Sequence, residues 1–330
     1  GVVVAVIDTG VRPHADLAAN LLPGYDFIID TAVSNDGSGR DADPSDPGDW
    51  VAANECGGVH AAETSSWHGT HVAGSIAAVT NNASGVAGVA YGSKVFAARV
   101  LGKCGGYTSD IADAIIWSSG GTVSGVPANA NPARVINLSL GGSGACDTTS
   151  QAAINSARSR GTVAVVAAGN SNANAANYSP ASCTGVITVA AVGRTGGRAY
   201  YSNYGAVVDV AAAGGDMSTG TANGIYSTLN AGNSTPGADS YAYYQGTSMA
   251  TPHVVGVVAL MLAKNPALTP DEVETRLKAS TRAFPATCSQ CGTGIVDASA
   301  AVDAATGVTP PPPPPPPTNN VAEVEPNNSR

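Results

Sequence analysis

The alternation of strand-like and helix-like segments constrains the fold of this chain more than any other feature. Runs rich in β-branched and small apolar residues predict buried strands at 2–7, 94–100, 134–139, 162–167 and 186–190. Helix-like stretches lie between them, near 68–79, 109–118 and 148–160. Strands and helices that alternate in this way build a mostly parallel sheet with helices on both faces. The chain is therefore predicted to be an α/β protein.

Two further segments complete this outline. Thr269-Pro270-Asp271-Glu272 is a capping box with proline at the first helical position, so a helix is expected to begin there. Residues 31–66 are rich in turn formers and acids, and they predict a surface insertion. The length of 330 residues allows one large domain or two smaller ones.

A small, hydroxyl-bearing turn at 246–253 runs directly into the apolar segment 254–262. The length of this region favours a helix with Pro252 in its first turn, where a missing N–H is tolerated. Ser248 then lies at the helix N-terminus, where free N–H groups and the helix dipole favour negative charge. A nucleophilic serine and its oxyanion fit this position, although a serine at a helix start is more commonly an N-cap.

Two other junctions carry the partners that a nucleophilic serine requires. Asp8 follows the strand-like run 2–7, and His68 opens the helix-like stretch 68–79. Taken singly, Asp8 reads as a strand-end cap and His68 as an ordinary helix residue. Together with Ser248 they supply an acid, a base and a nucleophile at the ends of elements, where open parallel sheets bind their ligands. The chain order Asp, His, Ser is not that of α/β-hydrolases or of chymotrypsin-like enzymes.

The motifs around these residues resemble those of the subtilases, the subtilisin-like serine proteases, over roughly residues 1–305. The similarity is carried by Val6–Gly10, His68–Gly74, Val135–Gly142, Val165–Asn170 and Gly246–His253. It implies a subtilisin-like three-layer α/β sandwich and a secreted serine endopeptidase. Within the family, the chain is most similar to secreted, disulfide-containing members from Gram-negative bacteria that carry a C-terminal pre-peptidase domain.

The resemblance also implies catalytic roles. Ser248 would attack the scissile carbonyl, His68 would act as general base and then general acid, and Asp8 would orient the imidazole. Asn170 and the backbone N–H of Ser248 would form the oxyanion hole. Read alone, Asn170 is a turn residue after a strand.

Substrate is expected to bind as an extended strand between 102–107 and 138–141. Glycines leave room for close backbone approach, and the pocket walls are small and uncharged. A broad specificity with preference for an apolar or aromatic P1 side chain is therefore expected, and Tyr178 is a candidate to narrow the pocket. The predicted substrate-binding residues are Gly102, Gly105, Gly106, Ser139, Leu140, Gly141, Ala167, Ala168, Gly169 and Thr247.

Other functions fit parts of this pattern. An esterase uses the same triad, and only peptide cleavage separates the two classes. A non-catalytic protein could keep the fold, although all four catalytic positions hold competent residues. His68 and His71 form a pair of the kind that binds zinc, but Gly69 stands where a zincin motif has glutamate. We therefore predict no catalytic metal, and a structural role for His71 and His253.

Six cysteines in an acidic chain indicate an oxidising compartment. They allow 15 pairings, and sequence alone does not select among them. The spacing Cys288-Ser289-Gln290-Cys291 also occurs in redox and zinc sites. The resemblance favours the disulfides Cys56–Cys104, Cys146–Cys183 and Cys288–Cys291.

Acidic and amide side chains on turns predict structural calcium, because this ion binds six to eight oxygen atoms. One candidate segment is the acidic run 30–49, for which a solvated surface loop is the alternative. The other is 80–86, at the position of the family's calcium loop. The predicted ligands are Asp30, Asp36, Asp41, Asp43, Asp46, Asp49 and Asn82.

The net charge of −9 argues against nucleic-acid binding. No uninterrupted apolar run is long enough to predict a membrane span. The expected partners are protein or peptide substrates and the chain's own propeptide, and the protein is expected to be a secreted monomer. Residues 1–307 are expected to form a catalytic domain truncated at its N-terminus, 308–320 a polyproline linker, and 321–330 the start of a C-terminal pre-peptidase-type domain.

Overall fold

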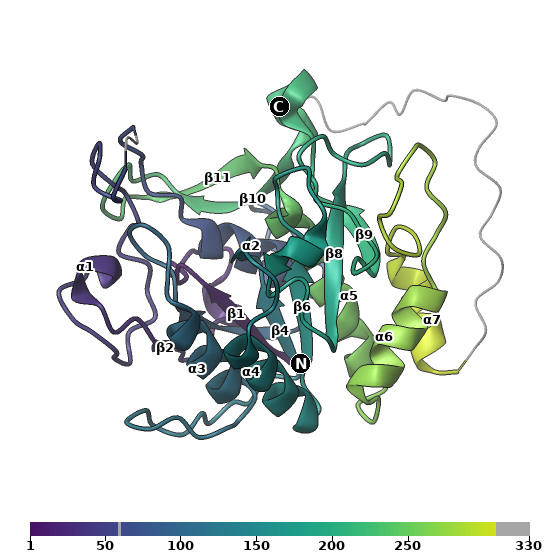
Figure 1. Ribbon diagram of the computed structural model, residues 1–330, viewed down its shortest axis with the longest axis horizontal. Coiled ribbons are helices and arrows are strands. Elements are labelled where there is room, and N and C mark those ends of the chain that lie inside the picture. Colours follow the sequence, from purple (N-terminus) through teal and green to yellow (C-terminus); the bar gives the residue numbers. More distant parts are fainter. Residues whose placement is uncertain (59–60, 308–330) are drawn as a thin grey trace.

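A computed structural model of the protein describes residues 1–58 and 61–307, so the predicted linker and C-terminal segment at 308–330 lie outside the described residues. Its centre is a seven-stranded parallel sheet in the order β2-β3-β1-β4-β6-β8-β9 (Figure 1). The strands are β1 (Val3–Asp8), β2 (Tyr25–Asp26), β3 (Lys94–Arg99), β4 (Val135–Leu138), β6 (Val163–Ala167), β8 (Val186–Val192) and β9 (Val210–Ala213). The five predicted strands are confirmed, and β2 and β9 add the two edges.

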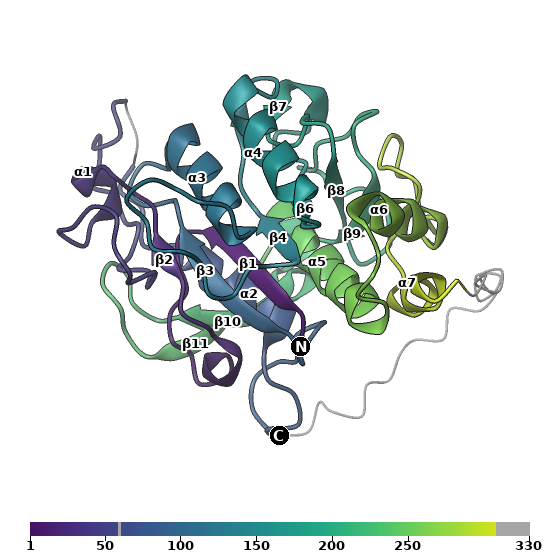
Figure 2. The ribbon, with the colours of Figure 1, turned by 90° about the horizontal axis from the view of Figure 1, so that it is seen from below.

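Helices cover both faces of the sheet, as the alternation predicted (Figure 2). The helices on one face are α3 (Thr108–Ser118) and α4 (Thr148–Ser159), and those on the other are α2 (His68–Ala77) and α5 (Thr247–Lys264). Successive side chains of β1 point to opposite faces of the sheet. Val4 and Val6 pack in the core with α2 and α5. Ala5 and Ile7 pack in the core with α3 and α4. The three-layer α/β sandwich is confirmed.

The predicted capping box opens α6 (Pro270–Ala279): Thr269 Oγ1 accepts from the Glu272 N–H, and the Glu272 carboxylate accepts from the Thr269 N–H. Next along the chain, α7 (Ala298–Ala305) packs against α5. The remaining elements are α1 (Thr31–Ser34), the hairpin of β10 (Ile225–Asn230) and β11 (Asp239–Tyr244), the pair β5 (Gly142–Ser143) and β7 (Tyr178–Ser179), and 3-10 turns at Ala18–Asn20, Ala175–Asn177, Met217–Thr219 and Thr221–Asn223.

The helix α5 begins at Thr247, so the prediction that Pro252 lies in its first turn is wrong. Pro252 lies in the second turn, where its N–H would have bonded to the carbonyl of Ser248. That carbonyl accepts from Ser139 Oγ at 2.8 Å instead, so the missing bond is replaced. By length and composition α5 would be able to cross a membrane, but 72% of this segment is buried inside the protein, as expected for a core helix.

Residues 31–66 form the predicted insertion, but they are not confined to the surface. Arg99, which is buried in β3, pairs with Asp36 at 2.9 Å and also with Asp26. Its Nε donates to the carbonyl of Thr9 at 3.2 Å, so the insertion is anchored beside the end of β1. The three disulfides have the expected pairings, Cys56–Cys104, Cys146–Cys183 and Cys288–Cys291.

Candidate active site

The four predicted catalytic residues come from four elements that meet at one edge of the sheet. Asp8 is the last residue of β1, and Asn170 lies three residues beyond β6. His68 is the first residue of α2, and Ser248 is the second residue of α5. Because parallel strands end at the same edge, this fold brings the side chains together from positions far apart in the sequence.

His68 and Asp8 are directly hydrogen bonded, with 2.8 Å between Nδ1 and Oδ1. The Asp8 carboxylate is fully buried, and its Oδ1 also accepts from the backbone N–H of Thr9 at 2.8 Å. A carboxylate only accepts, so Nδ1 of His68 carries the proton and Nε2 is left as an acceptor. The side chain of His68 is 22% exposed, which keeps the ring open to the cleft.

Nearby carboxylates set the protonation of His68. Burial of the ring lowers the pKa of His68, but the charge of Asp8 and its hydrogen bond raise this pKa, with further contributions from Asp49 and Asp46. The net effect is a pKa above the ordinary value for histidine. The imidazolium form is therefore stabilised in this site.

Gly69 allows α2 to approach β1 closely enough for this contact. A Cβ at this position would lie 2.1 Å from the carbonyl oxygen of Gly10 and 3.2 Å from Cβ of Asp8. Any side chain here would force α2 away from the end of β1. Glycine at position 69 is thus required by the packing that places His68 beside Asp8.

Ser248 and Asn170 lie at the start of α5. Ser248 Oγ donates to the carbonyl of Ser139 at 3.1 Å, and within the described residues it forms no hydrogen bond with His68. Asn170 Oδ1 accepts from the N–H and the hydroxyl of Thr247, at 2.8 and 2.9 Å. These two bonds fix the orientation of the amide and leave Nδ2 as a donor next to the serine.

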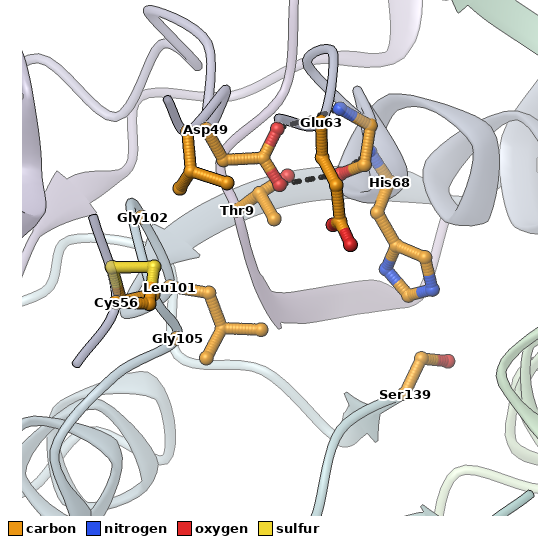
Figure 3. Close-up of a pocket in the computed structure, with 12 residues that line it drawn as sticks. Thr9, Asp49, Cys56, Glu63, His68, Leu101, Gly102, Gly105 and Ser139 are labelled. Carbon is orange, nitrogen blue, oxygen red and sulfur yellow. Dashed lines mark hydrogen bonds between the residues drawn. A yellow bond between two sulfur atoms is a disulfide. The ribbon is translucent and has the colours of Figure 1, made fainter. Parts of the chain in front are cut away.

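Cavities along this edge bring the predicted substrate-binding residues together. A cavity of about 440 Å³ lies beside His68 and is also lined by Gly102, Gly105 and Ser139 (Figure 3). A second, of about 590 Å³, lies between Gly105–Gly106 and Leu140–Gly141. A third, of about 380 Å³, contains Ser248 and Asn170, and its other lining residues include Ser139, Leu140, Gly141, Ala167, Ala168, Gly169, Tyr178 and Thr247.

The turn at 102–105 pairs with itself, so it does not present a free strand edge for a substrate to pair with. The N–H of Gly102 donates to the carbonyl of Gly105 at 2.9 Å, and the N–H of Gly105 donates to the carbonyl of Gly102 at 3.1 Å. The disulfide Cys56–Cys104 ties this turn to the insertion. The N–H groups of both glycines are therefore already used within the turn.

The acidic run 30–49 does not gather into one cluster. Asp30 caps α1, Asp43 accepts from the N–H of Ser45, and Asp41 accepts from Ser38 Oγ and the N–H of Asp43. Across residues 1–58 and 61–307, no group of three or more histidine, cysteine or acidic side chains is arranged to hold a metal ion. Calcium in this run stays a prediction.

The second calcium candidate involves a residue that the sequence analysis missed. Asp16 is buried, and its carboxylate accepts from the N–H of Val86 at 2.9 Å and from Asn82 Nδ2 at 2.5 Å. Its carbonyl accepts from the N–H of Val79, so the loop 79–86 encloses it. Within the described part of the chain Asp16 forms no ion pair. No local sequence signal links it to a loop more than 60 residues away.

Predicted structural roles for two other histidines agree with their surroundings. His71 is fully buried, its Nε2 lies 3.0 Å from the carbonyl of Ile225, and its ring stacks on Tyr244. Burial lowers the pKa of His71 to about 4. His253 Nδ1 lies 2.8 Å from the carbonyl of Met249 within α5, and burial lowers the pKa of this ring as well.

Known proteins resemble this chain over most of its length. The profile of the Subtilase family matches residues 1–297. The extracellular protease of Xanthomonas campestris pv. campestris is 62% identical over 307 residues, which are 92% of this chain and 52% of that protein. The extracellular basic protease of Dichelobacter nodosus is 49% identical over 316 residues, or 93% of this chain and 51% of that protein. The chain thus spans about half the length of these curated relatives.

The fold has a close counterpart among solved structures. A protease from Pseudoalteromonas arctica is 68% identical and superposes with a TM-score of 0.91, over 92% of this chain and 90% of that chain.

Proposed function

Because the chain belongs to the subtilase family, we propose that it is a secreted serine endopeptidase that hydrolyses peptide bonds through an acyl-enzyme on Ser248. The observation that carries this proposal is the 2.8 Å bond between Asp8 and His68, formed at the same sheet edge as Ser248 and Asn170. The relatives from Xanthomonas campestris and Dichelobacter nodosus, both named as extracellular proteases, support it.

The reaction begins when Ser248 Oγ leaves the carbonyl of Ser139 and turns toward Nε2 of His68. His68 takes the hydroxyl proton while Oγ bonds to the scissile carbonyl carbon. The resulting imidazolium is stabilised by Asp8, and it then protonates the leaving amine as the C–N bond breaks. Water, deprotonated by the same Nε2, attacks the ester, releases the acid product and restores the Ser248 hydroxyl.

The negative charge of the tetrahedral intermediate falls at the start of α5. Asn170 Nδ2 and the N–H of Ser248 donate to this oxygen, and the positive end of the helix dipole favours it. Thr247, which holds Asn170 through Oδ1, fixes the donor in place before the substrate arrives. The hole is therefore preorganised.

Specificity follows from the third cavity. Its walls at 139–141 and 167–169 carry uncharged side chains, all of them small except Leu140, and they accept an apolar or aromatic P1 residue. Tyr178 lines the same cavity and is the candidate to narrow it. The N–H groups of Gly102 and Gly105 already donate hydrogen bonds within their own turn. The substrate backbone would therefore pair with Gly106 on one rim and with Gly141 on the opposite rim.

A structural calcium ion is also proposed at Asp16, a position separate from the run 30–49. The donors available there are the buried carboxylate of Asp16, the side-chain oxygen of Asn82 and carbonyls of the loop 79–86, an all-oxygen set that suits calcium. The bound ion would supply the cation that this carboxylate lacks and would hold the loop. A propeptide and a monomeric state stay predictions.

A fluorophosphonate probe tests the central proposal. The probe is expected to modify Ser248, located by peptide mass spectrometry, and His68→Ala is expected to abolish labelling on a chain that remains folded. Cleavage of a denatured protein substrate separates a peptidase from an esterase that shares the triad. A folded wild-type protein that neither labels nor cleaves peptides would refute the proposed function.

A further inference from the structure

The helix that carries His68 starts without a side-chain cap of its own. Its N-cap residue is Trp67, whose backbone is left-handed (φ 49°) and whose side chain gives no capping bond. The first N–H groups of a helix have no partner inside the helix, so they need outside acceptors. In α2 two of these groups belong to His68 and Gly69. Their acceptors therefore fix the position of the first turn of α2, which carries the imidazole ring of His68.

Two hydroxyls supply those acceptors: Ser66, directly before the N-cap residue, and Thr9, at the end of β1. The N–H of His68 donates to Ser66 Oγ at 3.3 Å. The N–H of Gly69 donates to Thr9 Oγ1 at 3.0 Å, and Thr9 is the neighbour of Asp8 in the chain. The start of α2 is thus held by two short side chains.

Each hydroxyl is itself fixed by a carboxylate of the insertion. Thr9 Oγ1 donates to Asp46 Oδ2 at 2.7 Å, and Ser66 Oγ donates to Asp49 Oδ2 at 2.6 Å. The backbone N–H of Ser66 also donates to Asp49, at 2.6 Å to Oδ1. Figure 3 shows Asp49 with its hydrogen bonds above the cavity that His68 lines. We call these connections, Asp46–Thr9–Gly69 and Asp49–Ser66–His68, the two relays.

The surroundings of Asp46 show that this arrangement is built into the interior. Its side chain is 1% exposed and Thr9 is 4% exposed. Within the described residues Asp46 forms no ion pair, and a buried carboxylate without a cation is unfavourable unless hydrogen bonds offset the cost. The offsetting donors are Thr9 Oγ1 and, at 2.8 Å to Oδ1, the N–H of Gly48.

We infer that Asp46 and Asp49 are positioning residues for His68, acting through the two relays to hold the start of α2 against Asp8. This inference rests on the proposed function, because it assigns the insertion a role in aligning the general base of that reaction. It also gives two acids of the run 30–49 a role that needs no metal ion.

The relays have an electrostatic consequence as well. The carboxylate of Asp49 places negative charge beside the ring and stabilises its protonated form. Asp46 adds to this effect where it is ionised, since burial raises the pKa of Asp46 to about 7. Removing such a charge favours the neutral ring, which is the form that accepts the serine proton. The other charged or titratable groups that face this region are Asp8, Arg12, Glu63, His71, Arg99 and Tyr244, whose hydroxyl donates to the carbonyl of Ser66 at 2.7 Å.

The test compares Asp46→Asn and Asp49→Asn with wild-type protein over a pH series, using a chromogenic peptide at both low and saturating calcium chloride. We expect kcat/KM to fall by about 10- to 100-fold through kcat, because small displacements of a catalytic group are costly. In Asp49→Asn the acid limb of the kcat/KM profile is also expected to move to lower pH. A role confined to folding would lower activity without moving this limb.

Asp297→Asn is the matched control, because Asp297 caps α7 by accepting from the N–H of Ala300 at 3.0 Å, away from the cavities of the cleft. It removes the same charge from a helix start and is expected to keep the wild-type kcat/KM and profile. Thr9→Ser and Thr9→Val form a second pair that avoids the buried carboxylate. Serine keeps the hydroxyl and is expected to retain activity, whereas valine is expected to behave as Asp46→Asn does.

The outcomes separate the two proposals. A wild-type protein that labels and cleaves, with both Asp variants folded and catalytically unchanged, overturns the inference alone. Equal losses in Thr9→Ser and Thr9→Val overturn the Asp46 relay, and a loss that disappears at high calcium shows that the acids act as metal ligands instead. A folded wild-type protein without labelling or cleavage refutes the proposed function and the inference with it.

Discussion

Replacing Asn170 is expected to separate catalysis from stability, because the two ends of its amide serve different partners. Oδ1 accepts two hydrogen bonds from Thr247, at 2.8 and 2.9 Å, and Thr247 is fully buried. Nδ2 is the proposed donor to the oxyanion. Asn170→Asp keeps an acceptor for Thr247 and removes the donor, whereas Asn170→Ala removes both.

The expected magnitudes differ accordingly. Loss of the oxyanion donor lowers kcat by about 10²–10³, or about 2.7–4 kcal/mol, a size taken from the equivalent asparagine of subtilisin and not worked out from this chain. The alanine variant also leaves the buried N–H and hydroxyl of Thr247 without their acceptor. An unsatisfied buried donor costs about 1–3 kcal/mol. Because the entropy of unfolding grows with chain length, in a chain of 330 residues each such donor corresponds to a drop in Tm of about 1.5–5 °C.

The assay combines two measurements on each variant. Steady-state kinetics with a chromogenic peptide bearing an aromatic P1 residue gives kcat and KM. Thermal unfolding is followed after covalent inactivation of any active fraction, so that self-digestion does not distort Tm. Both variants are expected to have a lower kcat with little change in KM. Only Asn170→Ala is expected to show the full drop in Tm relative to the wild type.

Two results would contradict this reasoning. A folded Asn170→Asp protein with kcat within about fivefold of wild type would remove Asn170 from the oxyanion hole. An alanine variant as stable as the wild type would show that Thr247 does not depend on Asn170. Either result would leave the fold intact and require a different donor beside Ser248.

Three further predictions concern other parts of the molecule. His71 has a folded-state pKa of about 4, below its ordinary 6.5, so as pH falls the unfolded chain binds the proton first. The free energy of unfolding is therefore expected to fall by about 3 kcal/mol between pH 7 and pH 4. Urea titrations at these two pH values should show this loss, and the loss should be smaller in His71→Gln. EDTA is expected to lower the Tm of the wild type, while Asp16→Asn starts lower and no longer responds; an unchanged wild-type Tm would refute structural calcium. Gly69→Ala is expected to destabilise the protein by about 1–3 kcal/mol and to reduce kcat/KM, because the added methyl would lie 2.1 Å from the carbonyl oxygen of Gly10. Gly92→Ala is the control, since the space around Gly92 is open, and it should match the wild type in urea titration and kinetics.

The parts of the fold that were predictable from sequence are those specified by local patterns. β1 and β8 are mostly apolar and almost entirely buried, and both are rich in β-branched residues, so the local sequence predicts each of them as a strand. β2 pairs only Tyr25 and Asp26 with β3, and β9 is a short Val-Ala-Ala-Ala segment. Such short edges are strands because a neighbouring strand offers hydrogen bonds, and that neighbour is invisible in the local sequence.

The same distinction applies to the site. Asp8 and His68 were identifiable because each stands within a contiguous motif at the end of an element. Asp16 was not, since its partners lie in a loop more than 60 residues later. The composition of 31–66 indicated only an exposed acidic loop. Its interior contacts are made with distant residues, as when Asp36 pairs with Arg99, 63 residues away.

The placement of Ser248 on α5 has a consequence for how the protein fails on heating. This helix contacts α2, α6 and α7 as well as β1, β4, β6, β8 and β9, so the proposed nucleophile is carried by an element that packs against both the sheet and the neighbouring helices. Displacing Ser248 therefore requires opening the core rather than fraying a loop. Heat inactivation and global unfolding are expected to share one time course, with no earlier phase in which a folded molecule has lost its serine.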